Sequence, residues 1–387
     1  MHTRHQIHFE NSKHMAALAA QSVDLVVTSP PYPMIEMWDA MFAGHNPDIR
    51  KAQSRRNGLE VFELMHRELD QVWQEVIRVL KPGAIVCINI GDAVRTINEN
   101  FMLYPNHSRI LNYFLQAGFT NLPAILWRKP TNAPNKFMGS GMLPPGAYVT
   151  LEHEYILVLR NGCKREFATA AARQNRRESA FFWEERNLWY SDVWMALVGA
   201  TQRLVKDPGR LRSGAFPFEV PYRLINMFSV KGDMVLDPFM GTGTTMWAAM
   251  AAGRNSTGFE VEPGFQEVIG PQAQGLVEFS NAIIQDRLYN HIEFVQDRFK
   301  AKGGFKYTNK HYKFPVMTNQ EKELLLNPLE GLEAIGDNRF DVTYLPGPQQ
   351  TFEDNWQELS LGLADCASPP RRPAATASQR AVQLKLL

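Results

Sequence analysis

Residues 234–245, Met-Val-Leu-Asp-Pro-Phe-Met-Gly-Thr-Gly-Thr-Thr, decide the fold class of this chain. Met234 to Asp237 is a short apolar run that predicts a buried strand, and Met246 to Ala252 predicts the helix that follows it. Between them, Gly241 and Gly243 allow a ligand to approach the backbone, and the first turn of the helix favours an anionic group. A strand, a glycine turn and a helix in this order are typical of an α/β sheet that binds its ligand at the carboxyl ends of its strands.

The same turn lacks the key residues of two other nucleotide-binding motifs. A phosphate-binding P-loop of the ATPase type needs Gly-Lys-Ser/Thr, and the turn contains no lysine. A dinucleotide fingerprint needs a third glycine, and this chain has Met246 there. The next predicted strand, Ser256 to Glu260, ends in an acidic residue of the kind that binds ribose hydroxyls. The glycine turn and Glu260 together predict an adenosyl ligand with a carboxylate near the turn, as in S-adenosylmethionine. The alternative is a purely structural turn.

The rest of the chain alternates apolar runs with amphipathic segments, which predicts a doubly wound, mostly parallel α/β sheet. Val23 to Thr28 is a β-branched run typical of a buried parallel strand. We expect Ser12 to cap a helix that follows it and precedes this strand, because the Ser12 hydroxyl can accept from an unpaired backbone N–H. We also expect Lys81-Pro82-Gly83 to end a helix over Phe62–Leu80. The other predicted strands are Ile7–Glu10, Ala84–Ile90, Pro123–Trp127 and Glu154–Leu159, and the other predicted helices are Arg109–Gln116 and Pro221–Phe228.

A second candidate site, Thr28-Ser29-Pro30-Pro31-Tyr32, follows the buried Val23 strand. The two prolines fix the backbone, so the carbonyl groups there point in set directions. The Ser29 hydroxyl and the Pro30 carbonyl can accept from the two hydrogens of an –NH2 group, and a flat base can stack on the Tyr32 ring. Two prolines alone also fit a plain turn after a strand. The whole stretch predicts a pocket for a base with an exocyclic amino group.

Composition sets the class of protein. The chain has 387 residues, 44% of them hydrophobic, which is enough for one large domain and a smaller one. No apolar run is long enough for a membrane span, and the N-terminus lacks the apolar core of a secretory signal, so we expect a cytoplasmic protein. Three scattered cysteines without a C-x-x-C pair argue against a disulfide framework and against a zinc site.

Net charge is only +1, but basic residues gather in two stretches. Solvated surface and phosphate binding are both open interpretations, and the second depends on whether these stretches flank a cleft. The first stretch contains Arg50, Lys51, Arg55 and Arg56, and the second contains Lys164, Arg165, Arg173, Arg176 and Arg177, followed by several aromatic residues.

Both candidate sites resemble motifs of one enzyme family. Ser29 to Tyr32 resembles the catalytic Asp/Asn/Ser-Pro-Pro-Tyr/Phe motif of the amino-group DNA methyltransferases, and Asp237 to Thr245 resembles their cofactor loop. The catalytic motif comes about two hundred residues before the cofactor motif, which is similar to the permuted β group. Phe216 to Pro221 is similar to the segment before the cofactor loop in that group. The resemblance covers residues 7–263 and implies a Rossmann-like methyltransferase sheet with an inserted DNA-recognition region.

The resemblance implies a role for each matching position. Ser29, Pro30, Pro31 and Tyr32 would be catalytic. Base flipping and direct transfer from S-adenosylmethionine are expected, because no cysteine lies at the motif to form a covalent adduct. The cofactor would be bound by the glycine loop, by Glu260 at the ribose and by Asn11 at the adenine, with Phe216 and Phe218 either beside it or in the ordinary core. The residues of the loop assigned to the cofactor are Asp237, Phe239, Gly241, Gly243 and Thr244.

The family pattern also predicts the organisation of the chain. Residues 1–162 would be the catalytic half, 163–212 the target-recognition region and 213–264 the cofactor-binding half. Residues 265–363 form an extension that either adds DNA contacts or supports the sheet, of which we favour the second. Residues 364–387 form a flexible tail rich in Pro, Ala, Ser and Arg. DNA contacts are expected from both basic stretches, at Arg50, Lys51, Arg55, Arg56, Arg173, Arg176 and Arg177.

The expected substrate is duplex DNA. Ser in the first motif position resembles the cytosine-N4 enzymes more often than the adenine-N6 enzymes, so cytosine N4 is favoured and adenine N6 is the alternative. RNA, a protein amide and an inactive DNA-binding module are less favoured; Ser29 argues against the amide, and Gly241, Gly243 and Glu260 argue against the inactive module. The resemblance further implies a bacterial or archaeal source and a partner restriction endonuclease.

Overall fold

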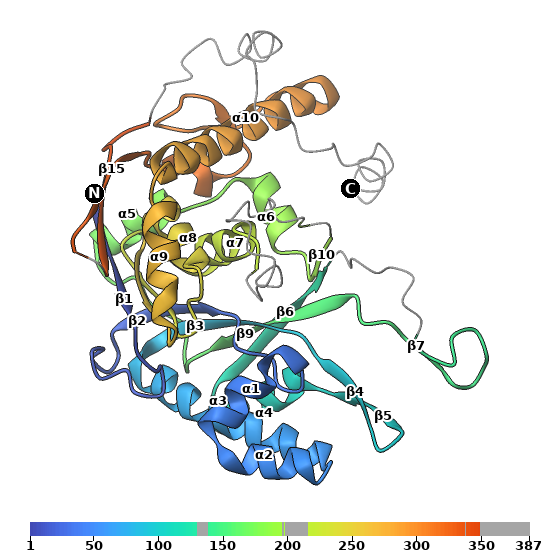
Figure 1. Ribbon diagram of the computed structural model, residues 1–387. Coiled ribbons are helices and arrows are strands. Elements are labelled where there is room, and N and C mark those ends of the chain that lie inside the picture. Colours follow the sequence, from blue (N-terminus) through green and yellow to red (C-terminus); the bar gives the residue numbers. More distant parts are fainter. Residues whose placement is uncertain (130–137, 196, 198–215, 337, 349–387) are drawn as a thin grey trace.

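A computed structural model describes residues 1–129, 138–195, 197, 216–336 and 338–348. A ten-stranded sheet runs through the molecule, with strand order β10-β6-β9-β3-β2-β11-β12-β1-β16-β15 (Figure 1). Its strands are β1 (His2–His8), β2 (Val23–Thr28), β3 (Leu80–Ile90), β6 (Thr120–Arg128), β9 (His153–Arg160), β10 (Val193–Trp194), β11 (Met234–Asp237), β12 (Asn255–Phe259), β15 (Leu329–Ala334) and β16 (Arg339–Tyr344).

Most strands of this sheet point the same way. The central pairs β3·β2, β2·β11, β11·β12 and β12·β1 are parallel, whereas β9 is antiparallel to both its neighbours, as is β16. The prediction of a doubly wound, mostly parallel α/β sheet is confirmed. All six residues of β2 are buried, as expected for a strand covered on both faces.

Helices cover both faces of the sheet. On one face, α3 and α4 pack over Val26, Val86 and Ile88, and on the other α7 and α8 pack over Leu25 and Val27. The helices are α1 (Asp39–His45), α2 (Pro47–Ser54), α3 (Gly58–Val79), α4 (Asn106–Gln116), α5 (Ala170–Glu178), α6 (Trp183–Trp189), α7 (Glu219–Phe228), α8 (Thr244–Ala252), α9 (Gln266–Gln272) and α10 (Leu276–Lys302), with 3-10 turns η1 (Glu36–Trp38), η2 (Pro263–Phe265) and η3 (Asn319–Glu323). Within the described part of the chain, none of these helices is long and apolar enough to cross a membrane.

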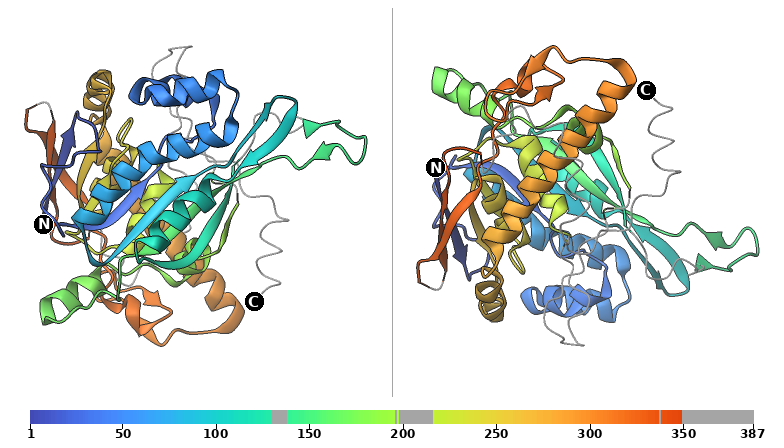
Figure 2. Two further views of the ribbon diagram at one scale, coloured as in Figure 1. Left: turned by 90° about the horizontal axis from the view of Figure 1, so that it is seen from below. Right: turned by 90° about the horizontal axis from the view of Figure 1, so that it is seen from above.

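Two hairpins project together from one end of the sheet (Figures 1 and 2). They are formed by β4 (Ala93–Ile97) with β5 (Asn100–Tyr104), and by β7 (Met138–Gly139) with β8 (Ala147–Tyr148). The rings of Phe101 and Tyr148 stack across them, 4.3 Å apart between centroids. Another small pair, β13 (Tyr307–Thr308) with β14 (Pro315–Val316), lies in the C-terminal part.

Two local predictions differ from the structure. The expected helix after Ser12 is absent from the described residues 12–22, which form turns; Asn11 Oδ1 accepts from Lys13 N at 3.0 Å and starts a turn instead. Lys81-Pro82-Gly83 does follow the end of α3, but these residues already belong to β3, which begins at Leu80. Pro82 is tolerated there because it lies near the beginning of its strand.

The residues after 264 add two strands to the same sheet. β16 pairs antiparallel with β1, and β15 pairs with β16. Tyr344 Oη donates to Met250 O at 2.7 Å and lies 2.9 Å from Thr3 Oγ1, which connects the far end of the described chain to α8 and β1. The predicted tail, 364–387, lies outside the described residues.

Candidate active site

The predicted base pocket and the predicted cofactor turn meet at the carboxyl ends of two adjacent strands. β2 and β11 pair in parallel, with Leu236 opposite Val26. Thr28 and Asp237 therefore end their strands side by side, and Thr28 Oγ1 donates to Asp237 Oδ1 at 2.6 Å. Because open α/β sheets bind ligands at this edge, the two motifs belong to one site although they lie far apart in the sequence.

The Tyr32 hydroxyl belongs to a hydrogen-bond network behind the predicted base pocket. Tyr32 Oη donates to Glu154 Oε2 at 3.0 Å, accepts from Asn89 Nδ2 at 2.9 Å and lies 3.1 Å from Ser29 Oγ. Asn89 Nδ2 also donates to Glu154 Oε2 at 2.7 Å, and Lys129 Nζ donates to Glu154 Oε1 at 2.7 Å. Burial, and then the neighbouring Glu154 carboxylate, raise the pKa of Tyr32 well above its ordinary value, so the phenol stays protonated.

The directions of these hydrogen bonds follow from Glu154. A carboxylate only accepts, so Tyr32 gives its hydrogen to Glu154 and keeps its lone pairs for donors. The Ser29 hydroxyl can then donate to Tyr32. Its oxygen accepts a long hydrogen bond from Asn89 Nδ2 at 3.5 Å and keeps one lone pair for a donor in the pocket. The network thus leaves acceptor capacity on the Ser29 oxygen.

The backbone of the Pro-Pro-Tyr loop is held against the end of β3. Asn106 Nδ2, at the start of α4, donates to Pro33 O at 3.0 Å and to Gly91 O at 2.9 Å. An added Cβ at Gly91 would lie 3.0 Å from Tyr32 Cε2, so a side chain there would press on that ring. Pro30 is buried. These contacts fix the position of the loop backbone relative to β3 and α4.

The glycine turn between β11 and α8 has two glycines in the left-handed region. Gly243 caps α8 with φ +83°, and Gly241 has φ +53° with open space where a side chain would be. Gly241 N donates to Glu260 Oε2 at 2.9 Å, and Glu262 N donates to Oε1 at 2.8 Å. Each carboxylate oxygen keeps a further lone pair, so Glu260 can still accept from a hydroxyl.

Asp237 connects the two motifs and is itself buried. Its carboxylate accepts from Thr28 Oγ1 and Thr245 Oγ1, both at 2.6 Å, and from Phe239 N at 3.0 Å. Burial raises its pKa to about 6, although the hydrogen bonds from the two threonines and Phe239 lower it. With 4% of its surface exposed, Asp237 orders the turn and has little surface left for a ligand.

The remaining predicted cofactor residues lie at or near this edge. Phe239 packs on Trp73, with ring centroids 5.8 Å apart. Thr244, the first residue of α8, is buried. Asn11 follows β1, which pairs in parallel with β12, so Asn11 lies at the same edge as Glu260.

The two phenylalanines before α7 differ in their surroundings. Phe216 is buried in the core on the α7 side of the sheet. Phe218 is half-buried, stacks on Tyr222 with a centroid distance of 5.4 Å and makes an edge contact with Phe279 at 5.0 Å. Phe216 thus fits the alternative of an ordinary core residue.

Comparison with known proteins assigns the family. The family model of the N6/N4 type, described as DNA methylase, matches residues 23–270, which is more than half of the chain. The chain belongs to this DNA methylase family. The type II methyltransferase M.MthZI of Methanothermobacter thermautotrophicus is 51% identical over 345 residues, or 89% of this chain and 96% of that protein. M.MjaI of Methanocaldococcus jannaschii is 48% identical over 278 residues, or 69% and 90%.

A solved structure agrees with the fold of this DNA methylase. The crystal structure of TTHA0409 from Thermus thermophilus, complexed with S-adenosyl-L-methionine, is similar with a TM-score of 0.53 and 31% identity. The similarity covers 69% of this chain and 94% of that chain.

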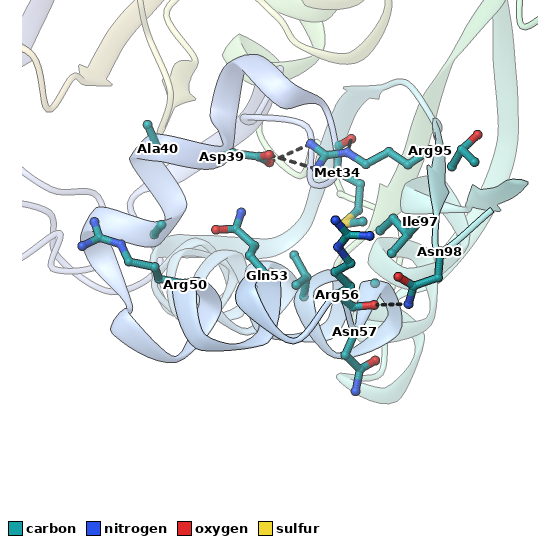
Figure 3. A pocket seen from close by; sticks show the side chains of 14 residues that line it. Met34, Asp39, Ala40, Arg50, Gln53, Arg56, Asn57, Arg95, Ile97 and Asn98 are labelled. Atoms are coloured by element: carbon teal, nitrogen blue, oxygen red, sulfur yellow. Dashed lines mark hydrogen bonds and ion pairs between the residues drawn. The ribbon is translucent and has the colours of Figure 1, made fainter. Parts of the chain in front are cut away.

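The first basic stretch of the DNA methylase lies beside the base-pocket loop, on α2 and the turn after it. Lys51 pairs with Asp48 at 2.8 Å and Arg55 with Glu60 at 2.7 Å. Arg50 and Arg56 line a cavity of about 650 Å³ between α1, α2, α3 and β4 (Figure 3). Its wall includes Met34, two residues after Tyr32.

The second basic stretch lies at the opposite edge of the sheet. Arg165 donates to Asp233 at 2.6 and 2.9 Å, just before β11 begins, and lies 3.6 Å from Asp24 at the beginning of β2. Asn175 of α5 donates to Lys231 O at 2.8 Å. β2 is about 20 Å long at ~3.3 Å per residue, so this end lies far from Tyr32, and Figure 2 shows α5 away from the projecting hairpins.

The structure therefore does not bring Arg173, Arg176 and Arg177, all on α5, to the predicted pocket. The Arg176 guanidinium covers the ring of Phe167, 4.7 Å from its centroid. Residues 198–212 of the predicted recognition region lie outside the described residues, whereas β10 pairs in parallel with β6 and so ends at the carboxyl edge.

Three polar residues of the DNA methylase site were not singled out from the sequence. They are Asn89, Glu154 and Asn106, all buried. Asn89 stands within the apolar run of β3, and Glu154 begins the apolar run of β9. A polar residue in or next to a buried strand is the signal that could have found the first two, because buried polar groups need partners. Asn106 has no comparable signal, since the start of a helix commonly carries a polar residue.

Proposed function

We propose that this DNA methylase transfers a methyl group from S-adenosylmethionine to the N4 amino group of cytosine in duplex DNA. The observation that carries this proposal is the network at Ser29. Ser29 has an uncharged hydroxyl at a position where the motif that it resembles can carry Asp, and its oxygen is kept as an acceptor through Tyr32 and Glu154. Adenine N6 is the alternative target, because its amino group would meet the same two acceptors, Ser29 Oγ and Pro30 O.

The residues at the glycine turn fit S-adenosylmethionine. The open space at Gly241 admits a ligand against the backbone, and Glu260 at the tip of β12 retains lone pairs for ribose hydroxyls. Asn11 is proposed for the adenine, and Phe239 for the methionine part. When bound, S-adenosylmethionine supplies an electrophilic methyl group on a sulfonium. The solved complex of TTHA0409 with this compound supports the assignment.

The protein's task is to position and polarise the amino nitrogen. Its lone pair is delocalised into the base ring, so it is a weak nucleophile. Hydrogen bonds from the –NH2 group to Ser29 Oγ and Pro30 O draw the nitrogen towards tetrahedral geometry and direct its lone pair to the methyl group. The base must first leave the duplex, at a cost of a few kcal/mol that stacking on Tyr32 offsets. Much of the remaining barrier is lowered by positioning.

A site-specific methyltransferase of this kind would act with a restriction endonuclease of the same specificity, whose cleavage it prevents. The relatives M.MthZI and M.MjaI, both type II methyltransferases, support this part of the proposal. Duplex DNA is accordingly the expected partner.

Two measurements test the proposal. A plasmid methylated by the protein is digested to nucleosides and examined by mass spectrometry, and a second sample undergoes modification-sensitive sequencing. N4-methylcytosine at a defined site is the expected result. N6-methyladenine without N4-methylcytosine would overturn the choice of base, and methylation of RNA but not of DNA would overturn the choice of substrate.

A further inference from the structure

The cavity beside the base-pocket loop has the charge of an anion site. Its charged lining residues are Arg50, Arg56, Arg95 and Asp39, so the lining carries three positive charges and one negative charge, with the Arg50 side chain at the outer side (Figure 3). Arg95 is already engaged, since it donates to both oxygens of Asp39 at 2.9 and 2.7 Å and to Met34 O at 2.5 Å. Arg50 and Arg56 have no carboxylate partner among the described residues.

The second feature of the cavity is its size and its polar lining. A volume of about 650 Å³ lies within the range of ligand pockets, ~300–1,000 Å³. The amide side chain of Gln53 also lines it, and Figure 3 shows Gln53 and Arg56 directed into the space below the Asp39–Arg95 pair. The amides of Asn57 and Asn98, also in the lining, are already bonded to Glu60 and to Arg56 O. Guanidinium groups bind phosphate oxygens in pairs, and amides bind sugar and base edges. The lining therefore suits one nucleotide.

The third feature is the distance to the base pocket. Met34 forms part of the wall, and its Cα can be at most about 7.6 Å from that of Tyr32, two residues earlier. Phosphates of one DNA strand recur every ~3.4 Å along the helix axis, and further apart where the strand is stretched by a flipped base. A nucleotide next to the flipped base can thus reach the cavity.

Backbone conformation also marks this wall. Met34 and Arg56 have φ of +66° and +54°, values that cost free energy for residues with a side chain. Arg95 bonds the Met34 carbonyl, and Asn98 Nδ2 donates to Arg56 O at 3.3 Å, so neighbouring residues hold both conformations. Such strain is retained where a defined geometry is needed.

We infer that this cavity binds the phosphate of a nucleotide flanking the flipped base, through Arg50 and Arg56. The inference rests on the proposed function and deepens it, because it divides the basic stretch in two. Arg50 and Arg56 bind the target strand, whereas Lys51 and Arg55 stabilise α2 and the beginning of α3 through Asp48 and Glu60.

The test compares two double variants with the same loss of charge. Arg50→Gln/Arg56→Asn removes the cavity cations, with Asn at position 56 because Asn tolerates a positive φ. Lys51→Gln/Arg55→Gln removes the paired cations of the same stretch. The probe is a fluorescein-labelled duplex with the site found by sequencing, titrated from about 50 to about 200 mM NaCl. Thermal unfolding and S-adenosylmethionine binding of each variant are measured alongside, and both should match the wild type for Arg50→Gln/Arg56→Asn.

The two variants should behave differently. Arg50→Gln/Arg56→Asn should weaken duplex binding roughly tenfold per arginine and lower the salt slope by about 2. Lys51→Gln/Arg55→Gln should change affinity by less than about threefold, as expected of charges that touch no phosphate. Equal losses of duplex affinity in both variants, or no loss in Arg50→Gln/Arg56→Asn, would overturn the inference. Methylation of DNA by the wild type would be unaffected by that result.

The phosphate bound in this cavity could also belong to a free nucleotide. Calorimetry with dCMP and with inorganic phosphate distinguishes a free nucleotide from a DNA strand. Weak or absent binding of both, together with the duplex result above, supports a strand phosphate. Binding of dCMP that is lost in Arg50→Gln/Arg56→Asn, with duplex affinity unchanged, would assign the cavity to a free nucleotide and overturn the inference. Absence of any DNA methylation by the wild type would instead count against the proposed function.

Discussion

Glu154 accepts from Tyr32, Asn89 and Lys129, at 3.0, 2.7 and 2.7 Å. These three donors come from the base-pocket loop, from β3 and from the end of β6. At the residue scale, the carboxylate therefore decides the direction of every hydrogen bond between itself and Ser29. In the proposed function the Ser29 hydroxyl acts as an acceptor, and an acceptor role requires that its own hydrogen be placed elsewhere.

A change of Glu154 to Gln tests that argument. The glutamine amide can donate to Tyr32 Oη. Tyr32 would then give its hydrogen to Ser29, and the Ser29 hydroxyl would direct its own hydrogen into the pocket. We expect kcat to fall roughly tenfold or more, comparable to the loss of a hydrogen bond to a charged group, while S-adenosylmethionine affinity is unchanged. Glu152→Gln is the matched control, since Glu152 pairs with Arg128 at the surface. Equal kcat in both variants would show that Glu154 is merely structural.

Asp237 predicts a specific dependence of stability on pH. Its pKa is about 6 in the folded protein and 3.8 ordinarily, so between these values the folded state binds more protons than the unfolded state. This carboxyl therefore stabilises the fold most at low pH, and its contribution is lost as pH rises from about 4 to about 6. The loss amounts to at most ~3 kcal/mol.

Urea unfolding at several pH values checks this expectation on wild type and Asp237→Asn. The stability of the wild type relative to the variant should decline across that pH window, because Asn cannot ionise. Asp297→Asn, at an exposed position, controls for the loss of a surface carboxyl. A constant difference for Asp237→Asn would mean that the carboxyl titrates at its ordinary value.

At the scale of elements, the turn between β11 and α8 combines a left-handed backbone at glycine with open space. Gly241 has φ +53° and Gly232, at the other end of β11, has φ +80°; neither has any atom within 4 Å of an added Cβ. A side chain at either position would have the same kind of conformational cost. Gly241 lies at the ligand end of β11 and Gly232 at the opposite end.

Alanine at each glycine separates these effects. Both variants should lose about 1–2 kcal/mol of unfolding free energy, because a left-handed backbone is costly for Ala. Gly241→Ala should in addition weaken S-adenosylmethionine binding by more than about tenfold, since the new methyl group would occupy the cradle. Gly232→Ala should leave that affinity intact. Calorimetry of both variants decides, and equal affinities would place the cofactor elsewhere.

At the scale of the whole molecule, the residues after 264 complete the sheet that carries the site. β1 has β12 on one side and β16 on the other, and β12 carries Glu260 at its end. Without β16, β1 would be the edge strand of the sheet, paired only with β12 and with the backbone hydrogen-bonding groups of its other side exposed. Phe340 and Val342 of β16 are buried against α8 and β1.

Removal of residues 329–387 should lower Tm strongly or abolish soluble expression, whereas removal of 364–387 should change neither. Phe340→Ala keeps the strand and should cost about 3–5 kcal/mol, which tests the packing if the long truncation fails to fold. Thermal unfolding of the three proteins provides the comparison. A stable, active protein lacking 329–387 would show that β16 is dispensable.

The sequence by itself determined the class of sheet, the strands β2 and β11, the glycine turn and the two motifs of the site. Each of these depends on residues close together in the chain, where periodicity, propensity and turn chemistry act locally. The tertiary structure decided what depends on distant contacts. Glu154 meets Tyr32 across 122 positions, and Thr3 meets Tyr344 across 341. It also divided the basic residues between two edges of the sheet, because charge in a sequence does not say which end of a strand it will reach.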